Sequence, residues 1–542
     1  MTDEQVEAWI EADPDPRTRA ELRGLDPESL AERFSGTLHF GTAGLRGPVR
    51  AGPAGMNVAV VSGATAGVGQ WLIDHGHRGG SVVVGRDARH GSEDFFSATT
   101  QVLAAQGFDV IALPEPGPTP LVAFAVRDLG AVAGIQITAS HNPPADNGYK
   151  VYLDEGAQLI PPADAEIEQL ITQVGPAKDI PRAAVAADSR ARANLERYLA
   201  RLVTRFGSRE RRRVRIALTA MHGVGGDIAV QALRECGFHD VAVVGLQHSP
   251  DPDFPTAAFP NPEEPGASDL LLDLARDSGA DLAIALDPDA DRCAVGACVD
   301  GAWRMLSGDE TGALLGAEIV DGHRGENALV ASTIVSGTLL GKIAAAAGTR
   351  HVTTLTGFKW LVRAGDGLVY AYEEAIGHCV DPDAVRDKDG ISAAVAVCVL
   401  AERLLASGQD LGDRLDDLFT EFGVHATAQY AIRVDHLSDI ADVMTALRTD
   451  PPPRLAGTTV SVEDFSARPG PWATDAVQFT GSTDHDQVRV IARPSGTEPK
   501  LKFYLEVALA PRTELGDAKA LARARLDALS AQVAEFAASV RR

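Results

Sequence analysis

The fold is decided by the stretch SVVVGRDARHGSEDFFSATTQVLAAQGFDVIAL at residues 81–113. A β-branched run is followed by a glycine-containing loop, an amphipathic stretch with helical spacing, a glycine and a second apolar run. That order predicts strand, helix and strand, joined by a right-handed crossover between parallel strands. The stretch therefore indicates an α/β domain.

Two later segments keep the same order and nearly the same spacing. They are VRIALTAMHGVGGDIAVQALRECGFHDVAVVGL at 214–246 and ALVASTIVSGTLLGKIAAAAGTRHVTTL at 328–355. Three related units predict three similar mixed α/β domains built on mainly parallel sheets.

The C-terminal part has a different pattern. Apolar and polar residues alternate in QYAIRVD (429–435), QVRVIA (487–492) and KLKFYLEVA (500–508), which favours half-buried antiparallel strands. We therefore expect a smaller C-terminal α+β domain. At roughly 150 residues per domain, a chain of 542 residues predicts three or four domains. The expected boundaries are 1–205, 206–308, 309–424 and 425–542, with the four domains around a central cleft.

Composition narrows the class of partner. The chain has 50 Lys and Arg against 75 Asp and Glu, a net charge of −25, which would repel nucleic acid and anionic lipid. Hydrophobic residues make up 45% and charged residues 23%, so neither a disordered nor a fibrous chain fits. We expect small-molecule partners, no nucleic acid and no membrane, and a monomer or homodimer.

The cysteines and the N-terminus favour the cytoplasm. The five cysteines include no CxxC pair, which is typical of reduced thiols in a cytosolic protein. The first residues, MTDEQVEAWIEADPDPRTR, are acidic and lack the basic and apolar regions of a signal peptide. The longest apolar stretch, 391–401, is far shorter than the roughly 20 residues of a membrane span.

The first loop with chemical potential is GIQITASHNPPADNGYK at 134–150. An apolar strand-like run delivers Ser140, His141 and Asn142 before two prolines that forbid continued pairing. A serine hydroxyl is a weak nucleophile, and it needs a base, a metal or prior phosphorylation to react. The alternative is an ordinary Ser/Asn turn, but the length and specificity of the loop favour a site.

The second loop is DLAIALDPDADR at 281–292, in which a buried-strand run leads to Asp287, Asp289 and Asp291. In an extended loop, alternate residues would point the same way. Three carboxylates together repel unless a hard cation neutralises them, and oxygen ligands favour Mg²⁺ over zinc. The alternative is a solvated acidic turn.

The sequence excludes two other classes of protein that have acidic loops. An EF-hand would need Gly and Glu where this chain has Arg292 and Cys298. The DxD pattern of haloacid-dehalogenase-like enzymes continues with Thr, where this chain has Asp291.

Two further loops suggest recognition of sugar and phosphate. In LVYAYEEAIGHCVDPDAVRDKDG (368–390), the pair Glu373 and Glu374 could accept hydrogen bonds from sugar hydroxyls, although surface charge is the ordinary alternative. In VIARPSGTEPKLKFYLE (490–506), Arg493 supplies a planar donor fork, and the following Ser, Gly and Thr suit a phosphate nest. A basic turn between strands is the alternative there.

Nucleotide-binding motifs fail on inspection. At 336–343 a P-loop would need Gly in place of Ser336 and Ser or Thr in place of Ile343. At 222–227 the last glycine of GxGxxG would fall on Ile228. A nucleotide is therefore not the expected ligand.

Taken together, the loops resemble those of the α-D-phosphohexomutase family, which includes phosphoglucomutases and phosphomannomutases. The resemblance runs almost end to end, through FGTAGLRG (40–47), TASHNP, DPDADR, EEAIG and RPSGTEP. MHGVGG (221–226), FPNPEEP (259–265) and TGFKW (356–360) are most similar to the branch of longer phosphoglucomutases and phosphopentomutases.

The resemblance implies a role for each loop. Ser140 would be the phosphoserine, and its oxygen would bind Mg²⁺ with Asp287, Asp289 and Asp291. The residues that would surround the transferred group are Arg46, His141, Lys150 and Arg292. Those that would orient the sugar are Thr356, Gly357, Lys359, Glu373 and Glu374. The set that would grip the non-reacting phosphate is Arg493, Ser495, Gly496 and Thr497.

The implied activity is an isomerase reaction by intramolecular phosphotransfer. Phosphate would move between the 1- and 6-hydroxyls of glucose or mannose through a sugar 1,6-bisphosphate, which also serves as activator. A phosphopentomutase acting on 1- and 5-phosphates of ribose or deoxyribose is one alternative, and a non-catalytic sugar-phosphate-binding paralogue is another. Ala375 stands where the family often has Ser, so the preferred sugar stays open.

Overall fold

The computed structural model describes residues 2–41, 44–208, 210–434, 437–483, 485–495 and 500–540. The chain forms two compact units. The first comprises Met1–Met305 and Ala375–Ser407, and the second Leu306–Glu374 and Gly408–Arg542. Each unit is described by itself.

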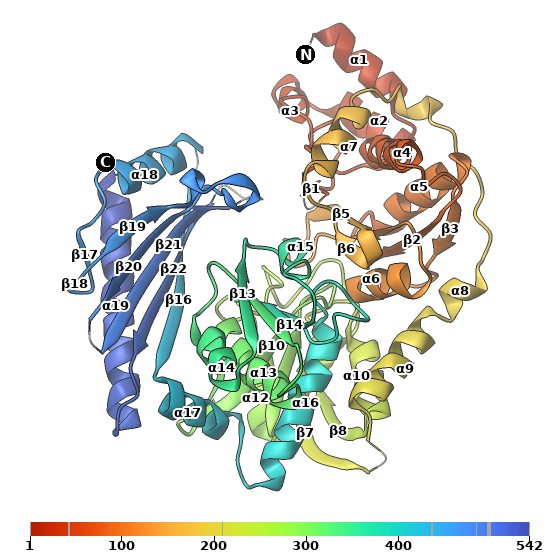
Figure 1. Cartoon of the computed structure of the whole chain (residues 1–542). Helices are drawn as coiled ribbons and strands as arrows, with labels where there is room; N and C mark the ends of the chain where they lie inside the picture. Colours follow the sequence, from red (N-terminus) through yellow and green to blue (C-terminus); the bar gives the residue numbers. More distant parts are fainter. Residues whose placement is uncertain are drawn as a thin grey trace. The chain divides into compact units, whose positions relative to one another are not determined.

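The first sheet confirms the prediction made from residues 81–113. Strand β2, the first strand of that segment, pairs in parallel with β3 and β4, while β5 pairs antiparallel with β1, β4 and β6. Helices α4, α5 and α7 lie on one face and α6 on the other (Figure 1). The strands are β1(Leu45–Pro48), β2(Ser81–Arg86), β3(Asp109–Ala112), β4(Ala133–Ile137), β5(Asp146–Leu153) and β6(Ala157–Gln158); the helices are α4(Val58–Asp74), α5(Ser92–Ala105), α6(Thr119–Asp128) and α7(Ala163–Ile171).

Three short helices precede this sheet. Two of them begin with proline directly after an aspartate that caps the helix, and all three have a side-chain cap. Their buried residues form a small apolar cluster around Ile10, Leu22 and Phe34. They are α1(Asp3–Ala12), α2(Pro16–Gly24) and α3(Pro27–Arg33).

The second sheet, also in the first unit, contains the repeat predicted at 214–246. β7 pairs in parallel with β8 and β9, and β10 turns back antiparallel between β9 and β11. All five residues of β9 are buried, so this strand brings its carboxyl end to the interior. The strands are β7(Arg212–Thr219), β8(Phe238–Val243), β9(Leu282–Leu286), β10(Cys293–Val299) and β11(Ala302–Met305); the helices are α8(Ser189–Arg192), α9(Asn194–Phe206), α10(Gly226–Glu235), α11(Gly245–His248) and α12(Asp269–Ser278).

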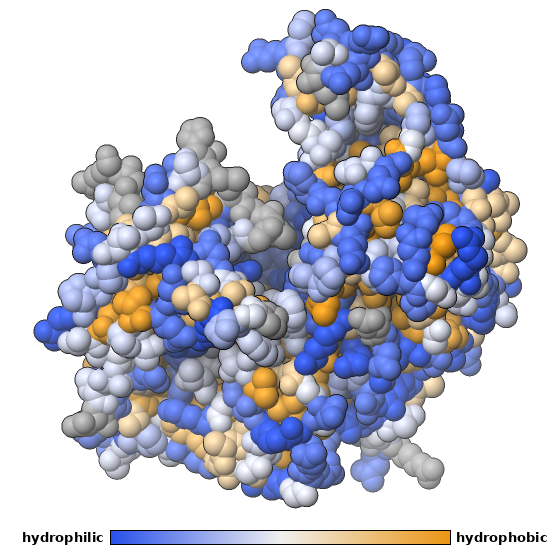
Figure 2. All heavy atoms as spheres, turned by 45° about the horizontal axis from the view of Figure 1, so that its top comes forward, coloured by the Kyte–Doolittle hydropathy of each residue, from blue (hydrophilic) through white to orange (hydrophobic). Residues whose placement is uncertain are grey.

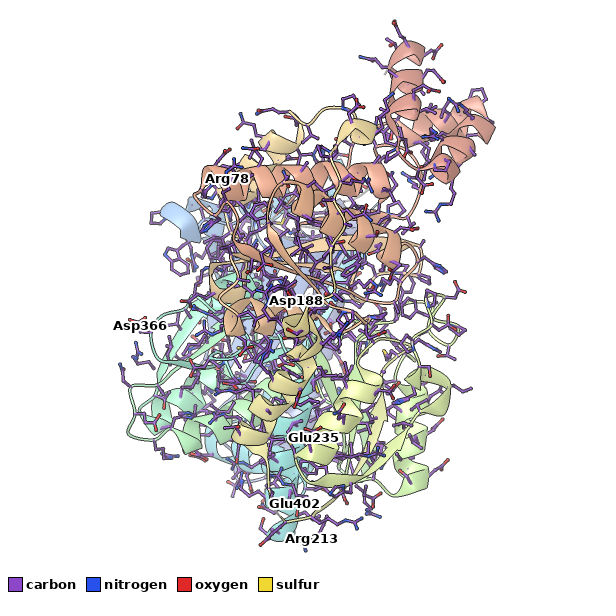
Figure 3. All side chains as sticks on the ribbon, turned by 90° about the vertical axis from the view of Figure 1, so that its right-hand side faces the viewer. Arg78, Asp188, Arg213, Glu235, Asp366 and Glu402 are labelled. Atoms are coloured by element: carbon purple, nitrogen blue, oxygen red, sulfur yellow. The ribbon has the colours of Figure 1, made fainter. Side chains whose placement is uncertain are left out.

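Residues 375–407, which lie within the predicted third domain, belong to the first of the two compact units; the four predicted domain boundaries stay a prediction. They form β15(Gly377–Cys379) and α16(Gly390–Ala406), and twelve of the seventeen residues of α16 are buried. A carboxylate oxygen of Glu402 accepts hydrogen bonds from the main-chain N–H groups of Arg213 and Val214 in β7. Figure 3 shows Glu402 and Arg213 next to each other. A helix buried on most sides packs wherever apolar surface is available, and chain order does not decide this.

The second unit contains the third repeat and the C-terminal sheet. In the third repeat, β12 pairs in parallel with both β13 and β14. The elements are α13(Gly308–Gly322), β12(Leu329–Thr333), α14(Leu339–Ala347), β13(Arg350–Thr354), α15(Phe358–Leu361), β14(Leu368–Glu373) and α17(Leu411–Phe422).

The C-terminal sheet is antiparallel, as predicted, in the order β16-β22-β21-β20-β19. Helix α19 packs on β16 and β22, and α18 lies beside it (Figure 1). The elements are β16(His425–Arg433), α18(Leu437–Thr449), β19(Ser461–Asp464), β20(Val477–Ser482), β21(Asp486–Pro494), β22(Lys500–Leu509) and α19(Leu515–Val540), with a separate two-strand ladder of β17(Arg454–Leu455) and β18(Thr458–Thr459).

One strand of this sheet differs from the half-buried pattern that we expected. Residues Phe503–Leu509 of β22 are all buried, because α19 covers one face of the strand. On the other face, Tyr504 joins a cluster with Ile334 and Val335 of the third repeat. The cluster unites the two sheets of this unit.

Hydrophilic residues cover most of the face shown in Figure 2, and hydrophobic residues occur there in small groups. Among the described residues no single helix is long and apolar enough to cross a membrane; only α16 and α17 counted together, across a sharp bend, reach that length and composition.

Candidate active site

The serine loop follows β4, whose five residues are all buried. Ser140 is 2% exposed, and its φ of +55° lies in the left-handed region that favours glycine. Its N–H donates to Thr138 Oγ1 at 2.9 Å. A non-glycine residue held in this conformation costs on the order of 1–3 kcal/mol and persists only where its surroundings enforce it.

The structure brings Ser140 to the triple-aspartate loop. Ser140 Oγ donates to Asp287 Oδ2 at 3.0 Å, and it lies 3.2 Å from His141 Nδ1. The two loops are 147 residues apart in the chain. The sequence analysis predicts that Ser140 and the three aspartates share one site. The contact is consistent with that hypothesis, which a serine far from the aspartates would have contradicted.

The three aspartates converge at the carboxyl end of β9. Each is 0% exposed, and one oxygen of each lies within 4.8 Å of the others. The loop is a turn, with Ala290 at a φ of +52°, so the expectation of an extended loop was wrong. The turn folds the carboxylates toward one centre, where an extended chain would space them along a line.

Main-chain packing supports this aspartate loop. Val224 N donates to Pro288 O at 2.9 Å, and Gly390 N donates to Ala290 O at 3.2 Å. A methyl group added at Gly223 would lie 2.4 Å from both the Cα and the carbonyl oxygen of Pro288. The MHGVGG segment therefore lies directly against the loop, and its glycine permits that approach.

Charges around the aspartates shift their pKa values in opposite directions. Burial, together with the neighbouring charges of Asp289 and Asp291, raises the pKa of Asp287 well above its ordinary value. Burial also acts to raise the pKa of Asp291, but Lys150 and Lys388 outweigh it and hold this pKa below the ordinary value. Three close carboxylates thus create a strong demand for positive charge.

The donor set fits a hard divalent cation. Among the described residues, Asp289 Oδ1 and Asp291 Oδ1 are buried and have no hydrogen-bond partner. Buried carboxylate oxygens are costly without a partner, and Mg²⁺ prefers such oxygen ligands. Asp287, Asp289 and Asp291 are therefore the residues that could hold Mg²⁺.

The predicted cationic residues of the first unit surround the same centre. Lys150 Nζ lies 2.6 Å from Asp289 Oδ2 and 2.7 Å from Asp291 Oδ2. Arg292 N donates to Asp287 Oδ1 at 3.1 Å, and its Nε lies 3.7 Å from Asp291 Oδ1. Arg46 of β1 donates to Asn142 Oδ1 in the serine loop at 3.3 Å. Their catalytic roles remain predictions.

His141 and Lys150 differ in their titration. Burial and the positive charges of Arg292 and Arg46 lower the pKa of His141 well below its ordinary value. Burial acts to lower the pKa of Lys150, but Asp289 and Asp291 outweigh it and raise this pKa. At neutral pH the site thus contains a neutral imidazole and a charged ammonium group.

The sequence analysis did not identify three residues near the aspartates, which are Thr119, Asp387 and Lys388. Thr119 Oγ1 donates to Asp289 Oδ2 at 2.5 Å. Lys388 Nζ lies 3.3 Å from Asp291 Oδ2 and 3.4 Å from Asp387 Oδ1. Lys388 and Asp387 both belong to the RDKDG segment (386–390). The sequence analysis singled out only Glu373 and Glu374 in that loop. The run of charged residues directly before an apolar helix is the sequence pattern that could have identified Lys388 and Asp387.

The predicted sugar residues lie in the second unit. Gly357, with a φ of +102°, precedes the short helix α15, which contains Lys359, and Thr356 comes directly before the glycine. Glu373 ends β14. Glu374 Oε2 accepts hydrogen bonds from Thr333 Oγ1 and Ser336 Oγ, each at 3.1 Å.

The predicted phosphate loop is described only in part. Arg493 lies in β21 opposite Lys502, and Ser495 N donates to Lys500 O at 2.7 Å. Gly496 and Thr497 lie outside the described residues.

A buried ionic cluster stands beside these strands in the second unit. Glu506 is 3% exposed and accepts from Thr338 Oγ1 at 2.8 Å and from Arg489 Nε at 3.0 Å. The same arginine donates to Ile334 O at 2.9 Å. The loop after β12, which holds Glu374 through Ser336, is thus tied to the C-terminal sheet.

The fold and the site together define an α/β enzyme in which a buried serine lies against three carboxylates. Known protein families and related sequences point to the same class. Models of phosphoglucomutase/phosphomannomutase α/β/α domains I, II and III match residues 37–178, 196–298 and 307–422. A probable phosphomannomutase of Haemophilus influenzae is 39% identical over 83% of this chain and 93% of its own length. A probable phosphoribomutase of Schizosaccharomyces pombe is 34% identical over 93% of both chains.

A solved structure shares the fold. It is a phosphoglucomutase/phosphomannomutase family protein from Burkholderia thailandensis, with a TM-score of 0.68 and 19% identity over 92% of this chain and 96% of the other. The chain belongs to the phosphoglucomutase/phosphomannomutase family, as the sequence analysis predicted. It is an enzyme of the mutase class, which are phosphotransferring isomerases.

Proposed function

We propose that the protein moves a phosphoryl group between the 1- and 6-hydroxyls of a hexose and that Ser140 carries the group. The observation that supports this most directly is the 3.0 Å contact between Ser140 Oγ and Asp287 Oδ2. Phosphoryl transfer depends mainly on positioning and on neutralising charge, and both conditions are met by a buried serine among cationic side chains.

The proposed reaction has two transfers. First, the P–O bond to phosphorylated Ser140 breaks as a free hydroxyl of the sugar monophosphate bonds to phosphorus. The sugar hydroxyl loses a proton and Ser140 Oγ gains one, so the products are a bound sugar bisphosphate and a free serine hydroxyl. The intermediate then turns over and returns its other phosphoryl group to Ser140. The sugar is released with its phosphate at the opposite end.

Side chains of the first unit would provide most of the electrostatic stabilisation of these transfers. Lys150 and Arg292 place positive charge beside the aspartates. When bound to Asp287, Asp289 and Asp291, Mg²⁺ would neutralise charge on the transferred group. We further propose that a sugar 1,6-bisphosphate primes the enzyme by phosphorylating Ser140.

Two predictions of the sequence analysis concern residues of the second unit, and we retain them as proposals. Thr356, Gly357, Lys359 and Glu373 orient the sugar. Arg493 and Ser495 contribute to a grip on the non-reacting phosphate. Glu374 also contributes to sugar binding, and its carboxylate holds the loop that contains Ser336.

A pentose substrate is the second candidate. The relative named a probable phosphoribomutase matches 93% of this chain, whereas the one named a probable phosphomannomutase matches 83%. Ala375 also removes a hydroxyl that members acting on hexoses often place in the sugar loop. A side-by-side assay of glucose, mannose, ribose and deoxyribose 1-phosphates separates the two; higher kcat/KM on the pentoses would overturn the hexose assignment.

Intact-mass analysis tests the phosphoserine directly. Incubation with glucose 1,6-bisphosphate and Mg²⁺ should add one phosphoryl group to the wild-type protein and none to Ser140→Ala. Ser278→Ala is the matched control, because Ser278 is exposed and its hydroxyl donates to Leu274 O of its own helix. Normal turnover by Ser140→Ala would refute the mechanism.

A further inference from the structure

Arg89 connects the first βαβ unit to the serine loop. It lies in the turn between β2 and α5 and is 4% exposed. Its guanidinium donates to four main-chain carbonyls of one loop: to Ser140 O at 2.6 Å, Asn142 O at 2.7 Å, Pro143 O at 2.9 Å and Asp146 O at 3.3 Å. No motif in the sequence analysis gave this arginine a role.

The serine loop needs such a support for two reasons. Ser140 is held at a positive φ, which a serine does not adopt by preference. The two prolines of the loop have no N–H, so they cannot donate to its carbonyl groups. Buried carbonyls require donors, and a planar guanidinium can reach several of them at once.

Arg89 is itself held from two sides. Its Nε lies 3.4 Å from Asp87 Oδ2, and its guanidinium lies 4.8 Å from the ring centre of Phe254. Asp87 is fixed in turn, because its Oδ1 accepts from Ser92 Oγ at 2.5 Å and its N–H donates to Ile137 O at 2.9 Å. The donor fork is therefore pre-oriented toward the loop.

Arg86, the last residue of β2, provides a matched comparison directly before the same turn. It is also buried and also donates to main-chain carbonyls, but these belong to Leu113 and Pro114. Its ion pair is with Glu93 at 2.6 Å. Arg86 thus shares the charge, burial and bonding type of Arg89, but among the described residues its side chain bonds to Leu113, Pro114 and Glu93 and not to the serine loop.

We infer that Arg89 is a positioning residue, oriented by Asp87, that holds the serine loop in the strained conformation presenting Ser140 Oγ to Asp287. The inference rests on the proposed role of Ser140. It assigns no contact between Arg89 and the substrate, since the two terminal nitrogens of its guanidinium donate to four main-chain carbonyls and its Nε lies 3.4 Å from the Asp87 carboxylate.

The test compares Arg89→Ala, Arg89→Lys and Arg86→Ala. A misplaced nucleophile costs on the order of 100-fold in rate, so we expect Arg89→Ala to lower kcat and the rate of Ser140 phosphorylation by glucose 1,6-bisphosphate about 100-fold, with KM nearly unchanged. Arg89→Lys keeps the charge and loses the fork, so it should be nearly as slow. Arg86→Ala should stay within about threefold of wild type.

Chemical rescue distinguishes positioning from general stability. Added guanidinium ion should restore part of the phosphorylation rate of Arg89→Ala and none of that of Arg89→Lys, whose side chain still fills the site. If Arg89→Ala does not fold, the test uses Arg89→Lys, in which slow phosphorylation of Ser140 by the folded protein supports the inference. Wild-type rates in either Arg89 variant, or an equal loss in Arg86→Ala, would overturn the inference. Failure of wild-type protein to phosphorylate Ser140 would instead overturn the proposed function.

Discussion

The serine loop and the aspartate loop meet 3.0 Å apart, yet different forces hold them. The serine loop is strained at Ser140, and the Arg89 side chain donates to four of its main-chain carbonyls. The aspartate loop is held through main-chain bonds from Val224 and Gly390 and by close glycine packing. Side-chain deletions should therefore weaken the first loop most, whereas added volume at a glycine should weaken the second.

The largest effect is expected from the aspartates themselves. Asp289→Ala should lower turnover at least about a thousandfold, because charge stabilisation of the transition state is lost. The measurement is kcat at several Mg²⁺ concentrations. Asp273→Ala is the control, since Asp273 is exposed and pairs with Arg276 in its own helix. Unchanged turnover of Asp289→Ala at limiting Mg²⁺ would refute the metal assignment.

Gly223→Ala probes the packing beneath the aspartate loop. The added methyl group would collide with the backbone of Pro288, and overpacking of this kind costs about 1–3 kcal/mol. We expect a lower melting temperature and weaker Mg²⁺ binding, measured by calorimetry. Gly63→Ala is the matched control because a methyl group there meets nothing within 4 Å. Equal stability of both variants would show that main-chain packing does not hold this loop.

Arg493→Ala tests a residue outside both loops. If Arg493 grips the non-reacting phosphate, its loss should raise KM for sugar phosphate about tenfold or more, as expected for a charge-assisted hydrogen bond, and change kcat less. Arg454→Ala, which removes an exposed arginine of the same unit, should leave KM unaltered. A normal KM for Arg493→Ala would contradict the proposed grip.

The last prediction concerns stability at acid pH, and not activity, near the aspartate loop. His378 is fully buried in β15, and burial lowers its pKa from 6.5 to about 3. Below pH 6.5 the unfolded chain gains a proton that the folded protein does not take up, so the free energy of unfolding falls as pH drops from 6.5 toward 3. The slope from this one group approaches about 1.4 kcal/mol per pH unit.

Denaturant unfolding at several pH values measures that slope. His378→Gln should show a shallower loss of stability on acidification than wild type. His77→Gln removes an exposed histidine and should leave the slope unchanged. Identical slopes for all three proteins would mean that His378 is protonated equally well when folded.

Local patterns predicted much of this protein. Apolar runs, glycines and helical spacing were sufficient for the three βαβ units, because each depends on neighbours close in sequence. Motif residues such as Ser140 and Asp289 were found because reactive residue types stood at strand ends. Arg89, Thr119 and Lys388 were not found, because an arginine, a threonine or a lysine in a turn is ordinary until its partners are known.

The sequence by itself determined the α/β class and the antiparallel C-terminal sheet, and it supplied the candidate residues for phosphoryl transfer. Only the tertiary structure decided that Ser140 meets Asp287, that α16 packs with the first unit, and that Arg89 supports the serine loop. The physical reason is the distance along the chain between the residues that interact. Secondary structure follows from contacts a few residues apart, while these three arrangements depend on groups brought together from distant parts of the chain by burial and hydrogen bonding.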